Sequence, residues 1–519
     1  MDWEAQPKAF RDWAGTQQIA LPRDVVVTEI SWSELAVARP SLPLNAANIG
    51  SLLRLCAGLT AWKEYAGSRW SLRAHPSSGN LHPTETWLIA SGVAGLEDGL
   101  YHYQNLHHAL ERRAWGSSCH AAGLWLGFSS IHWREAWKYG ERAFRYCQLD
   151  LGHVLAAVCY AAVLHGWRVR LLNIDSASVA NCLGLDREAD FAGVESEEPE
   201  VIVALEAIDS IPSSKSKVKQ GGDERTTMTV QVARQAVSEE ANVVSLMNLS
   251  WKHWAGKPGL LDARPLYQWP VIEEVADATR GAPPAADSLL AHARTEGSLK
   301  ADISASQVIL KRRSAQAFDG ESVMPHAVFK RILTGLLPGG SPVWNMWPHS
   351  ARVHPVLMVH RVEGVVNGLY VMPRSEVARA SLQTTFRDTF SWQPADPELP
   401  LFQLVCARAG KTARTLSCHQ DIATQCAVTF MMVAEFAEPV SSDPAAYRHL
   451  HWEAGMLGHV ITLEAEAAGW RGTGIGCFFD DADHEVLGLK DDQFQVIYHY
   501  AVGMAVDDPR LLTLPAYDK

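Results

Sequence analysis

The feature that most constrains this chain is that its second half repeats the landmarks of its first half. Four landmarks recur in the same order, although none of them is long. They are P-x-S-x-x-x-H-P at 76–83 and 348–355, Gly-Leu-Tyr at 99–101 and 368–370, an ungapped segment at 145–167 and 448–470, and Leu-Gly-Leu at 183–185 and 487–489. Because four landmarks in one order indicate an internal duplication, we expect the chain to fold into two similar units.

Each unit is predicted to combine one long buried helix with strands. In the ungapped segment of the first half, apolar residues recur at helical spacing, and Gly166 ends the pattern. These residues are Leu151, Val154, Leu155, Val158 and Ala162. Strand-like runs lie before and after the helix in both halves, at 84–90, 200–205, 356–360 and 495–502. Strands that alternate with long helices predict an α/β fold, more narrowly an α+β sandwich.

The duplication predicts domains at 1–208 and 301–519, with a linker and helical extension at 209–300 between them. Residues 210–225 are polar and rich in Ser, Lys and Gly, which is typical of a linker. Residues 233–299 contain helical pieces and tryptophans. We interpret them as an extension that packs on the second half, and the alternative is a loose connector.

Composition and charge argue against several classes of protein. The 519 residues are 47% hydrophobic, as in globular domains, and a net charge of −12 without a basic block argues against a nucleic-acid partner. No apolar run reaches the roughly 18–20 residues of a membrane helix, and no signal peptide is visible. Nine cysteines without a C-x-x-C pair predict reduced thiols in a cytoplasmic protein. His102, His107 and His108 lie close together in the sequence, as do His449 and His451, but neither set has the companion ligands of a metal site, so no metal is expected.

Three short stretches carry the polar and flexible residues that a binding site needs. Residues 75–83 (HPSSGNLHP) predict a turn whose amides and hydroxyls can face a polar ring or a phosphate. Residues 312–320 (RRSAQAFDG) place two arginines beside a serine, a set that suits phosphate oxygens. Residues 472–479 (GTGIGCFF) allow close approach of a ligand to the backbone. The alternatives are a plain loop, a solvated basic face and a glycine-rich turn without a ligand.

Together these stretches resemble the nitroreductase-like flavoproteins. Residues 76–83 are similar to the P-S-x-x-N-x-x-P loop of that superfamily. Residues 312–320 are similar to its R-R-S-x-R-x-F-d-G motif, with Gln316 where a basic residue often stands. Residues 138–146 and 150–153 resemble the SagB-type branch, the azoline dehydrogenases or thiazoline oxidases. The resemblance extends over two ranges, 50–205 and 306–506.

The resemblance implies a fold that normally works as a homodimer, with FMN in each of two clefts between subunits. One subunit supplies the R-R-S motif and a glycine turn, and its partner supplies the P-S-x-x-N loop. The two tandem nitroreductase-like domains would then form an intramolecular pseudo-dimer, which allows but does not require a further homodimer. The residues implied to bind FMN are Pro76, Ser77, Ser78, Gly79, Asn80, Arg312, Arg313, Ser314, Gln316, Gly474, Ile475 and Gly476. Arg510, which follows the last predicted strand, is a further candidate for the FMN phosphate, and the alternative is an exposed arginine of the tail.

Only one of the two clefts between the domains has its full set of motifs, which predicts one FMN per chain. That cleft combines the first-half loop with the R-R-S motif and glycine turn of the second half. The first half has no R-R-S near its start. When the halves are aligned, Leu171 and Asn173 stand where the second half has glycines. In the second-half loop, Arg352 stands where the first half has Asn80.

Lys138 and Tyr139 are the candidate catalytic residues. They match the Lys-Tyr pair that azoline dehydrogenases use near the substrate, and the aligned residues of the second half are Ser441 and Ser442. A lysine that is desolvated near other cations can act as a base, and a tyrosine can hold or carry a proton. The alternative is a surface lysine beside a packed tyrosine.

These features predict an FMN-dependent oxidoreductase. It would dehydrogenate a small-molecule or peptide-derived substrate by hydride transfer to flavin N5 and return the electrons to O2 or another acceptor. One alternative is an NAD(P)H-dependent reductase of nitro groups or quinones, and another is a scaffold with reduced activity that holds a biosynthetic enzyme partner. Such a partner also fits the dehydrogenase, because azoline dehydrogenases act on ribosomal peptides together with a cyclodehydratase.

Overall fold

The structure is a computed structural model that describes residues 5–117, 122–207, 246, 249–262, 268–284, 303–347 and 349–517. We call the residues up to 207 the first half and the residues from 303 the second half. The predicted linker at 210–225 and Pro348 of the second-half loop lie outside the described residues.

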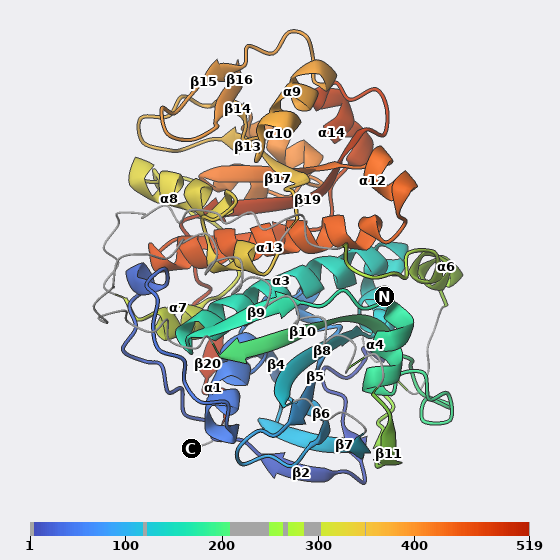
Figure 1. The fold of residues 1–519 in the computed structure, drawn as a ribbon. Helices are drawn as coiled ribbons and strands as arrows, with labels where there is room; N and C mark the ends of the chain where they lie inside the picture. Colours follow the sequence, from blue (N-terminus) through green and yellow to red (C-terminus); the bar gives the residue numbers. More distant parts are fainter. Residues whose placement is uncertain are drawn as a thin grey trace, which may run out of the picture.

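An antiparallel sheet of eight strands forms the centre of the first half (Figure 1). Its order is β11-β7-β6-β5-β8-β10-β9, and β2 also pairs with β7. The strands are β2 (Gln17–Ala20), β5 (Thr84–Ser91), β6 (Gly99–Gln104), β7 (Ala109–Ser117), β8 (Gly123–Ser130), β9 (Trp167–Leu171), β10 (Glu198–Ala207) and β11 (Trp251–Trp254). The strands predicted at 84–90 and 200–205 are therefore present as β5 and β10.

The second half contains a seven-stranded sheet with the order β15-β16-β14-β13-β17-β19-β18. Its strands are β13 (Val353–Val359), β14 (Gly368–Val371), β15 (Gln393–Pro394), β16 (Phe402–Cys406), β17 (Val428–Glu435), β18 (Arg471–Ile475) and β19 (Phe494–Gly503). The run β14-β13-β17-β19-β18 repeats the run β6-β5-β8-β10-β9 of the first half. The duplication predicted from the landmarks is thus present in the topology.

The helices repeat in the same way. The equivalent pairs are α1 (Ala46–Cys56) and α8 (His326–Leu336), α2 (His132–Tyr139) and α12 (Ala437–Ser442), α3 (Ala143–Leu164) and α13 (Ala446–Ala467), and α4 (Ser176–Leu183) and α14 (Asp480–Leu487). The remaining labelled helices are α6 (Pro270–Ala278), α7 (Ala305–Lys311), α9 (Glu376–Thr385), α10 (Gly410–Leu416) and α11 (Ile422–Gln425). Both Leu-Gly-Leu landmarks are helix ends, because Gly184 and Gly488 adopt the left-handed conformation that terminates α4 and α14.

The long helices α3 and α13 lie against each other between the two sheets (Figure 1). They cross at two glycines that the duplication pairs with each other. A Cβ on Gly152 would lie 2.2 Å from the carbonyl oxygen of Trp452, and a Cβ on Gly455 would lie 2.2 Å from the carbonyl oxygen of Leu149. The contact is the same from both sides, as at the two-fold interface of a homodimer.

The central position of α3 also explains its composition. The helical segment His132–Leu164 is long and apolar enough to cross a membrane, and 94% of its most apolar window is buried inside the fold. A helix that is enclosed on all sides by protein is expected to be apolar all round.

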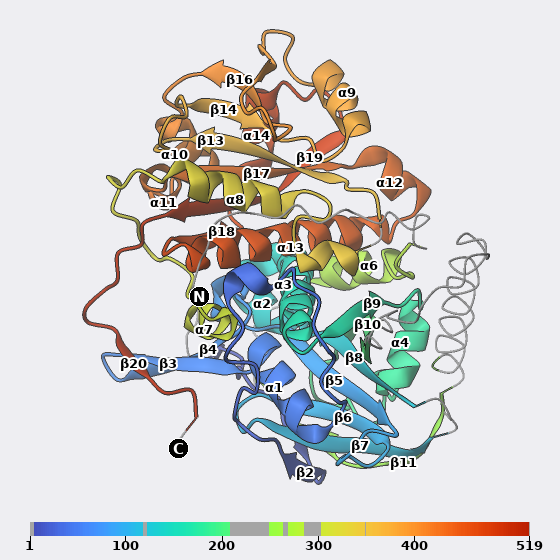
Figure 2. The same cartoon turned by 60° about the vertical axis from the view of Figure 1, so that its left-hand side comes forward.

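Short segments of each half also pair with the other half. Ser31 and Ser304 form an isolated β-bridge, and the N–H of Ala305 donates to the carbonyl of Ile30 at 2.8 Å. The last strand, β20 (Leu512–Leu514), pairs with β3 (Leu59–Tyr65) of the hairpin β3–β4, in which β4 spans Ser68–Arg73 (Figure 2). The two halves are therefore interlocked through backbone hydrogen bonds as well as packed.

The extension between the halves differs from its prediction. β11 pairs with β7, and β12 (Lys257–Pro258) pairs with β1 (Trp13–Ala14), so these segments join the first half. The expectation that the extension packs on the second half is wrong for them, because β11 satisfies the open backbone groups at the edge of β7. α6 lies against both halves: Arg448 of α13 donates to the carbonyl of Ala276, and Arg280 after α6 pairs with Glu198 of β10.

The prediction of reduced thiols is wrong for one pair of cysteines. Cys418 and Cys477 form a disulfide, with their Cα atoms 5.9 Å apart. The other described cysteines form no disulfide. The pair was missed because 59 residues separate the two positions in the sequence, and only the packing of the α10 region against the glycine turn brings them within bonding range.

We expect Cys418→Ser to lower the free energy of unfolding by about 2–4 kcal/mol, because the disulfide restricts the unfolded chain. Urea unfolding of the oxidised proteins measures this, with C406S at an exposed free thiol as the control. Thiol titration of the denatured chain should also show two fewer reactive groups before reduction than after it. Equal thiol counts would contradict the assignment.

Candidate functional site

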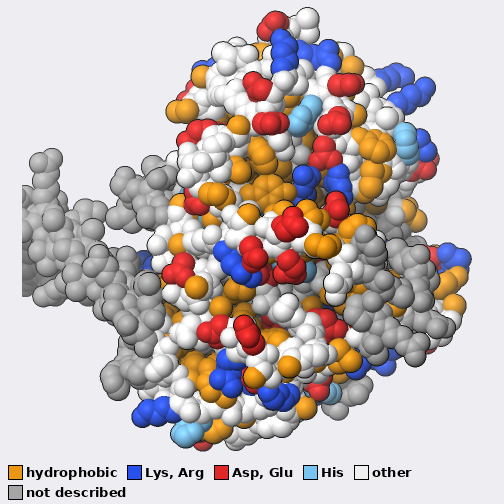
Figure 3. All heavy atoms as spheres, turned by 90° about the vertical axis from the view of Figure 1, so that its right-hand side faces the viewer, with side chains coloured by type: hydrophobic (Ala, Val, Ile, Leu, Met, Phe, Trp, Pro, Cys, Tyr) orange, Lys and Arg blue, Asp and Glu red, His pale blue; other side chains and the backbone are white. Residues whose placement is uncertain are grey.

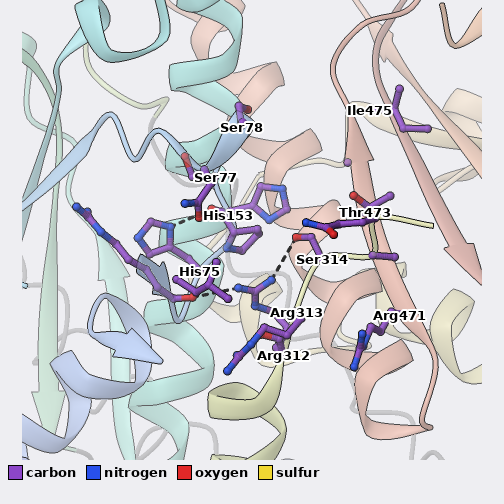
Figure 4. A pocket seen from close by; sticks show the side chains of 18 of the residues that line it. His75, Ser77, Ser78, His153, Arg312, Arg313, Ser314, Arg471, Thr473 and Ile475 are labelled. Carbon is purple, nitrogen blue, oxygen red and sulfur yellow. Dashed lines mark hydrogen bonds between the residues drawn. The ribbon is translucent and has the colours of Figure 1, made fainter. Parts of the chain in front are cut away.

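A cavity of about 920 Å³ lies between the halves, where the three predicted stretches meet. The first half contributes 75–80, and the second half contributes 311–316 and 473–477. In Figure 4, Ser77 and Ser78 of the first half lie across from Ser314, Thr473 and Ile475 of the second half. Every residue that the sequence implied for FMN, except Arg510, lines this cavity.

The loop that contains Ser77 and Ser78 is fixed by its own hydroxyls. Ser78 donates its N–H and its hydroxyl to the carboxylate of Asp150, each at 2.9 Å. The hydroxyl of Ser77 accepts the N–H of His82 at 2.8 Å. Both serines therefore hold the shape of the loop, which brings its backbone to the cavity.

Tyr139 lies directly over this loop. Gly79 has a φ of 55°, and a Cβ there would lie 2.4 Å from the Tyr139 hydroxyl, so this position requires glycine. The Tyr139 ring packs edge-on at 4.7 Å from the ring of Tyr146, against which Gly476 of the second half closes. Lys138 does not line the cavity; its Nζ lies 5.1 Å from the centre of the Tyr139 ring. Of the predicted catalytic pair, Tyr139 forms the wall and Lys138 lies beside it.

The two arginines of the R-R-S motif connect the halves. Arg312 is 3% exposed and donates to the carbonyls of Arg73 and Ala74 at 3.0 Å each. Arg313 donates to the Thr60 hydroxyl at 3.2 Å. Burial, and then the neighbouring charge of Arg313, lower the pKa of Arg312 to about 10. Arg312 thus brings a buried positive charge to the cavity, and its hydrogen bonds connect the second half to the first half.

Two further cations lie at the same end of the cavity, and the sequence reasoning missed both. Lys63 comes from β3 and Arg471 from the start of β18. Burial lowers the pKa of Lys63, and the charges of Arg313 and Arg471 lower it further, although Asp507 opposes them. Arg471 also forms an ion pair with Asp507, which lines the same cavity. Neighbouring cations of this kind can bind an anion such as phosphate. No motif marks these residues, because they meet only in the folded chain.

Arg510 lies outside the cavity wall. It is bound to Asp508 at 2.7 Å, and its guanidinium lies 3.3 Å from the Tyr65 hydroxyl. Its side chain is 68% exposed. The geometry therefore does not support the expectation that Arg510 reaches the cofactor.

Two buried acids beside the cavity were not predicted as site residues. Asp150 of α3 lines the cavity, and burial raises its pKa to about 7. Glu135 of α2 is fully buried, and burial together with the charge of Asp150 raises its pKa well above the usual range. The ungapped alignment of 145–167 with 448–470, which places Asp150 opposite Glu453, is the signal that could have found this position.

The opposite cleft is filled by the chain after α6. Asn173, which stands in place of a glycine, donates to the carbonyl of Pro283. Arg448 donates to the Thr279 hydroxyl at 2.9 Å, and Gly281 lies so close to Ala445 that a Cβ would be 2.8 Å from its methyl group. Figure 3 faces this side of the molecule and shows acidic, basic and apolar side chains interspersed over the described residues, without a continuous basic patch.

Residues 309–504 match the family model described as Nitroreductase family. Among curated proteins, the chain is 32% identical over 190 residues to "Trifolitoxin-processing protein TfxB" of Rhizobium leguminosarum bv. trifolii, which covers 31% of this chain and 51% of that protein. It is 26% identical over 170 residues to "Putative nitroreductase MJ1384" of Methanocaldococcus jannaschii, which covers 29% of this chain and 81% of that protein. The chain therefore spans about half the length of the first of these relatives.

Among solved structures, a "putative nitroreductase" from Anabaena variabilis superposes with a TM-score of 0.65. The match covers 98% of this chain and 95% of that chain at 19% sequence identity. This likeness extends over both halves and confirms the predicted fold class.

Proposed function

We propose that this chain, whose residues 309–504 form a nitroreductase family domain, is an FMN-dependent oxidoreductase with one active site between its halves. The observation that carries the proposal is the convergence of residues 76–80 and 312–316 on one cavity. These segments are more than 230 residues apart in the chain, and each is incomplete as a site without the other.

The residues of this cavity suit FMN. Its volume of about 920 Å³ lies within the range typical of ligand sites. We propose that Lys63, Arg313 and Arg471 hold the phosphate and that the backbone of residues 77–80 and of Gly474 and Gly476 faces the ring. When bound, FMN supplies reversible hydride transfer.

The protein residues would orient the substrate and control protons. Tyr139 and Tyr146 form an aromatic wall over the loop, against which a planar substrate ring can pack. We propose that the Tyr139 hydroxyl holds a proton at the substrate and that Lys138, whose ammonium lies beside the ring, tunes that hydroxyl.

We propose a small-molecule or peptide-derived substrate, as in the SagB-type dehydrogenases. The support is the Lys138–Tyr139 pair together with the similarity to a protein named for trifolitoxin processing. A biosynthetic enzyme partner fits the same proposal. The similarity to a protein named as a nitroreductase favours the second candidate, an NAD(P)H-dependent reductase. Rapid anaerobic bleaching of the flavin by NADPH would favour that reductase over the dehydrogenase.

We expect one FMN per chain, because the second cleft lacks the motif residues and residues 276–283 fill it. The flavin released on denaturation, measured by absorbance against protein concentration, gives this number. N80R places the arginine of the second-half loop in the first-half loop and should abolish FMN binding. The matched variant R352N should still bind one FMN per chain. A colourless chain, or a value near two, would contradict the proposal.

A further inference from the structure

Two carboxyl groups lie under the loop and under Tyr139. Asp150 lines the cavity, and its oxygens accept the N–H and the hydroxyl of Ser78. Glu135 lies one helical turn before Tyr139 on α2. It is 0% exposed, and among the described residues neither of its oxygens has a hydrogen-bond partner. Buried acids in such a setting are costly to keep ionised.

The corresponding acids of the second half, Glu453 and Glu438, both form ion pairs. Glu453, the counterpart of Asp150, forms an ion pair with Arg374 and accepts the N–H of Arg352 at 3.2 Å. Glu438, the counterpart of Glu135, is exposed and pairs with the Arg352 side chain at 3.3 Å.

In the first half these arginines are absent. The residue aligned with Arg352 is Asn80. Among the described residues, no Lys or Arg forms an ion pair with Asp150 or Glu135. Both halves thus keep acids at these two positions, but only beside the cavity do the acids lack an ion-pair partner among the described residues. A cluster of this kind in a cavity wall is a candidate for chemistry rather than for stability.

We propose that Asp150 is the group that takes the proton released by the substrate during its oxidation. This inference rests on the proposed function and goes beyond the Lys138–Tyr139 pair. A two-electron oxidation removes a hydride and a proton from the substrate. The hydride carries the electron pair of its bond to the cofactor, and the proton passes to a carboxylate oxygen of Asp150, which becomes a carboxylic acid. FMN would be the oxidant of this step, and O2 or another acceptor would reoxidise it between turnovers.

The surroundings suit this role. Because its pKa is raised to about 7, Asp150 is partly ionised at neutral pH, where a general base works best. Burial and the charge of Asp150 raise the pKa of Glu135 well above its usual range, which favours its neutral form. The titratable and charged groups that face the two acids are Arg134, Lys138 and Tyr139 on α2, Tyr146 and Cys147 on α3, and Tyr498 on β19. The pKa values of the tyrosines and of Cys147 are raised by burial, so these groups stay neutral.

The first test needs no cofactor. In the full apo-chain labelled with ¹³C at the aspartate and glutamate carboxyls, NMR should show one carboxyl that titrates at about pH 7. That signal should disappear in D150N and persist in E135Q, because it belongs to Asp150. It should also persist in E438Q, the exposed counterpart of Glu135. Titration of Asp150 at the ordinary pH of an aspartate would overturn the inference.

The second test uses the FMN-loaded chain and a peptide-like thiazoline as the probe. In the wild type, turnover should rise with pH through about 7 as Asp150 loses its proton. D150N should retain FMN but lose turnover by about a hundredfold, and its turnover should no longer rise with pH through about 7. We call this rise the acidic limb of the pH profile, and E135Q and E438Q should keep the limb. If D150N keeps the wild-type profile, or if E135Q loses the limb instead, the inference is overturned while the proposed function stands. A chain that binds no FMN overturns both.

Discussion

Replacing Gly152 by alanine is expected to lower the free energy of unfolding by at least about 3 kcal/mol, since overpacking against backbone cannot be relieved by a rotamer change. The added methyl group would lie 2.2 Å from the Trp452 carbonyl oxygen and 2.9 Å from the Cα of Gly455. The α3–α13 contact would have to separate, and with it the two halves that form the cavity.

Urea unfolding followed by tryptophan fluorescence measures this effect. The matched control is Gly335→Ala on α8, where the nearest neighbours of the new methyl group would be the Val460 and Glu464 side chains, at 3.0 Å and 3.4 Å. G455A should behave like G152A, because the contact is two-fold. An unfolding midpoint of G152A equal to that of G335A would show that the helices do not cross at these glycines.

Arg312→Met is expected to destabilise the chain by about 3 kcal/mol and to weaken FMN binding at least tenfold. The methionine can fill much of the space, but it leaves the carbonyls of Arg73 and Ala74 without their buried donor, and each unpaired group costs about 1–3 kcal/mol. It also removes a buried positive charge from the cavity wall.

The measurements are urea unfolding of the apo-chain and fluorescence titration of the apo-chain with FMN. R510M is the matched control, because Arg510 is exposed and lies outside the cavity wall. Its stability should change by no more than about 0.5 kcal/mol. If R510M loses FMN as R312M does, Arg510 contacts the cofactor as the sequence analysis expected. The placement of Arg510 outside the cavity wall would then be wrong.

Much of the site could be predicted from short-range patterns. The loop at 76–80 requires glycine at position 79, and the Arg312–Ser314 motif is recognisable without a structure. The uneven distribution of motifs between the halves also predicted which cleft would be complete. These inferences depend only on residue type and on local backbone conformation, which short sequence patterns carry.

The remaining parts of the site could not be predicted in this way. Lys63 and Arg471 have no motif, and they become neighbours only when β3 and β18 meet at the cavity. The bond between Cys418 and Cys477 and the filling of the second cleft by residues 276–283 are likewise contacts between distant segments.

The sequence by itself determined that the chain is duplicated, where its long helices and central strands lie, and which half carries each motif. Only the tertiary structure decided that Arg312 connects the halves, that Arg510 lies outside the cavity wall, and that Asp150 is buried without an ion-pair partner among the described residues. The physical reason is that periodicity and turn chemistry act over a few residues. Burial, charge compensation and pKa depend instead on which distant segments surround a side chain, and packing alone sets those neighbours.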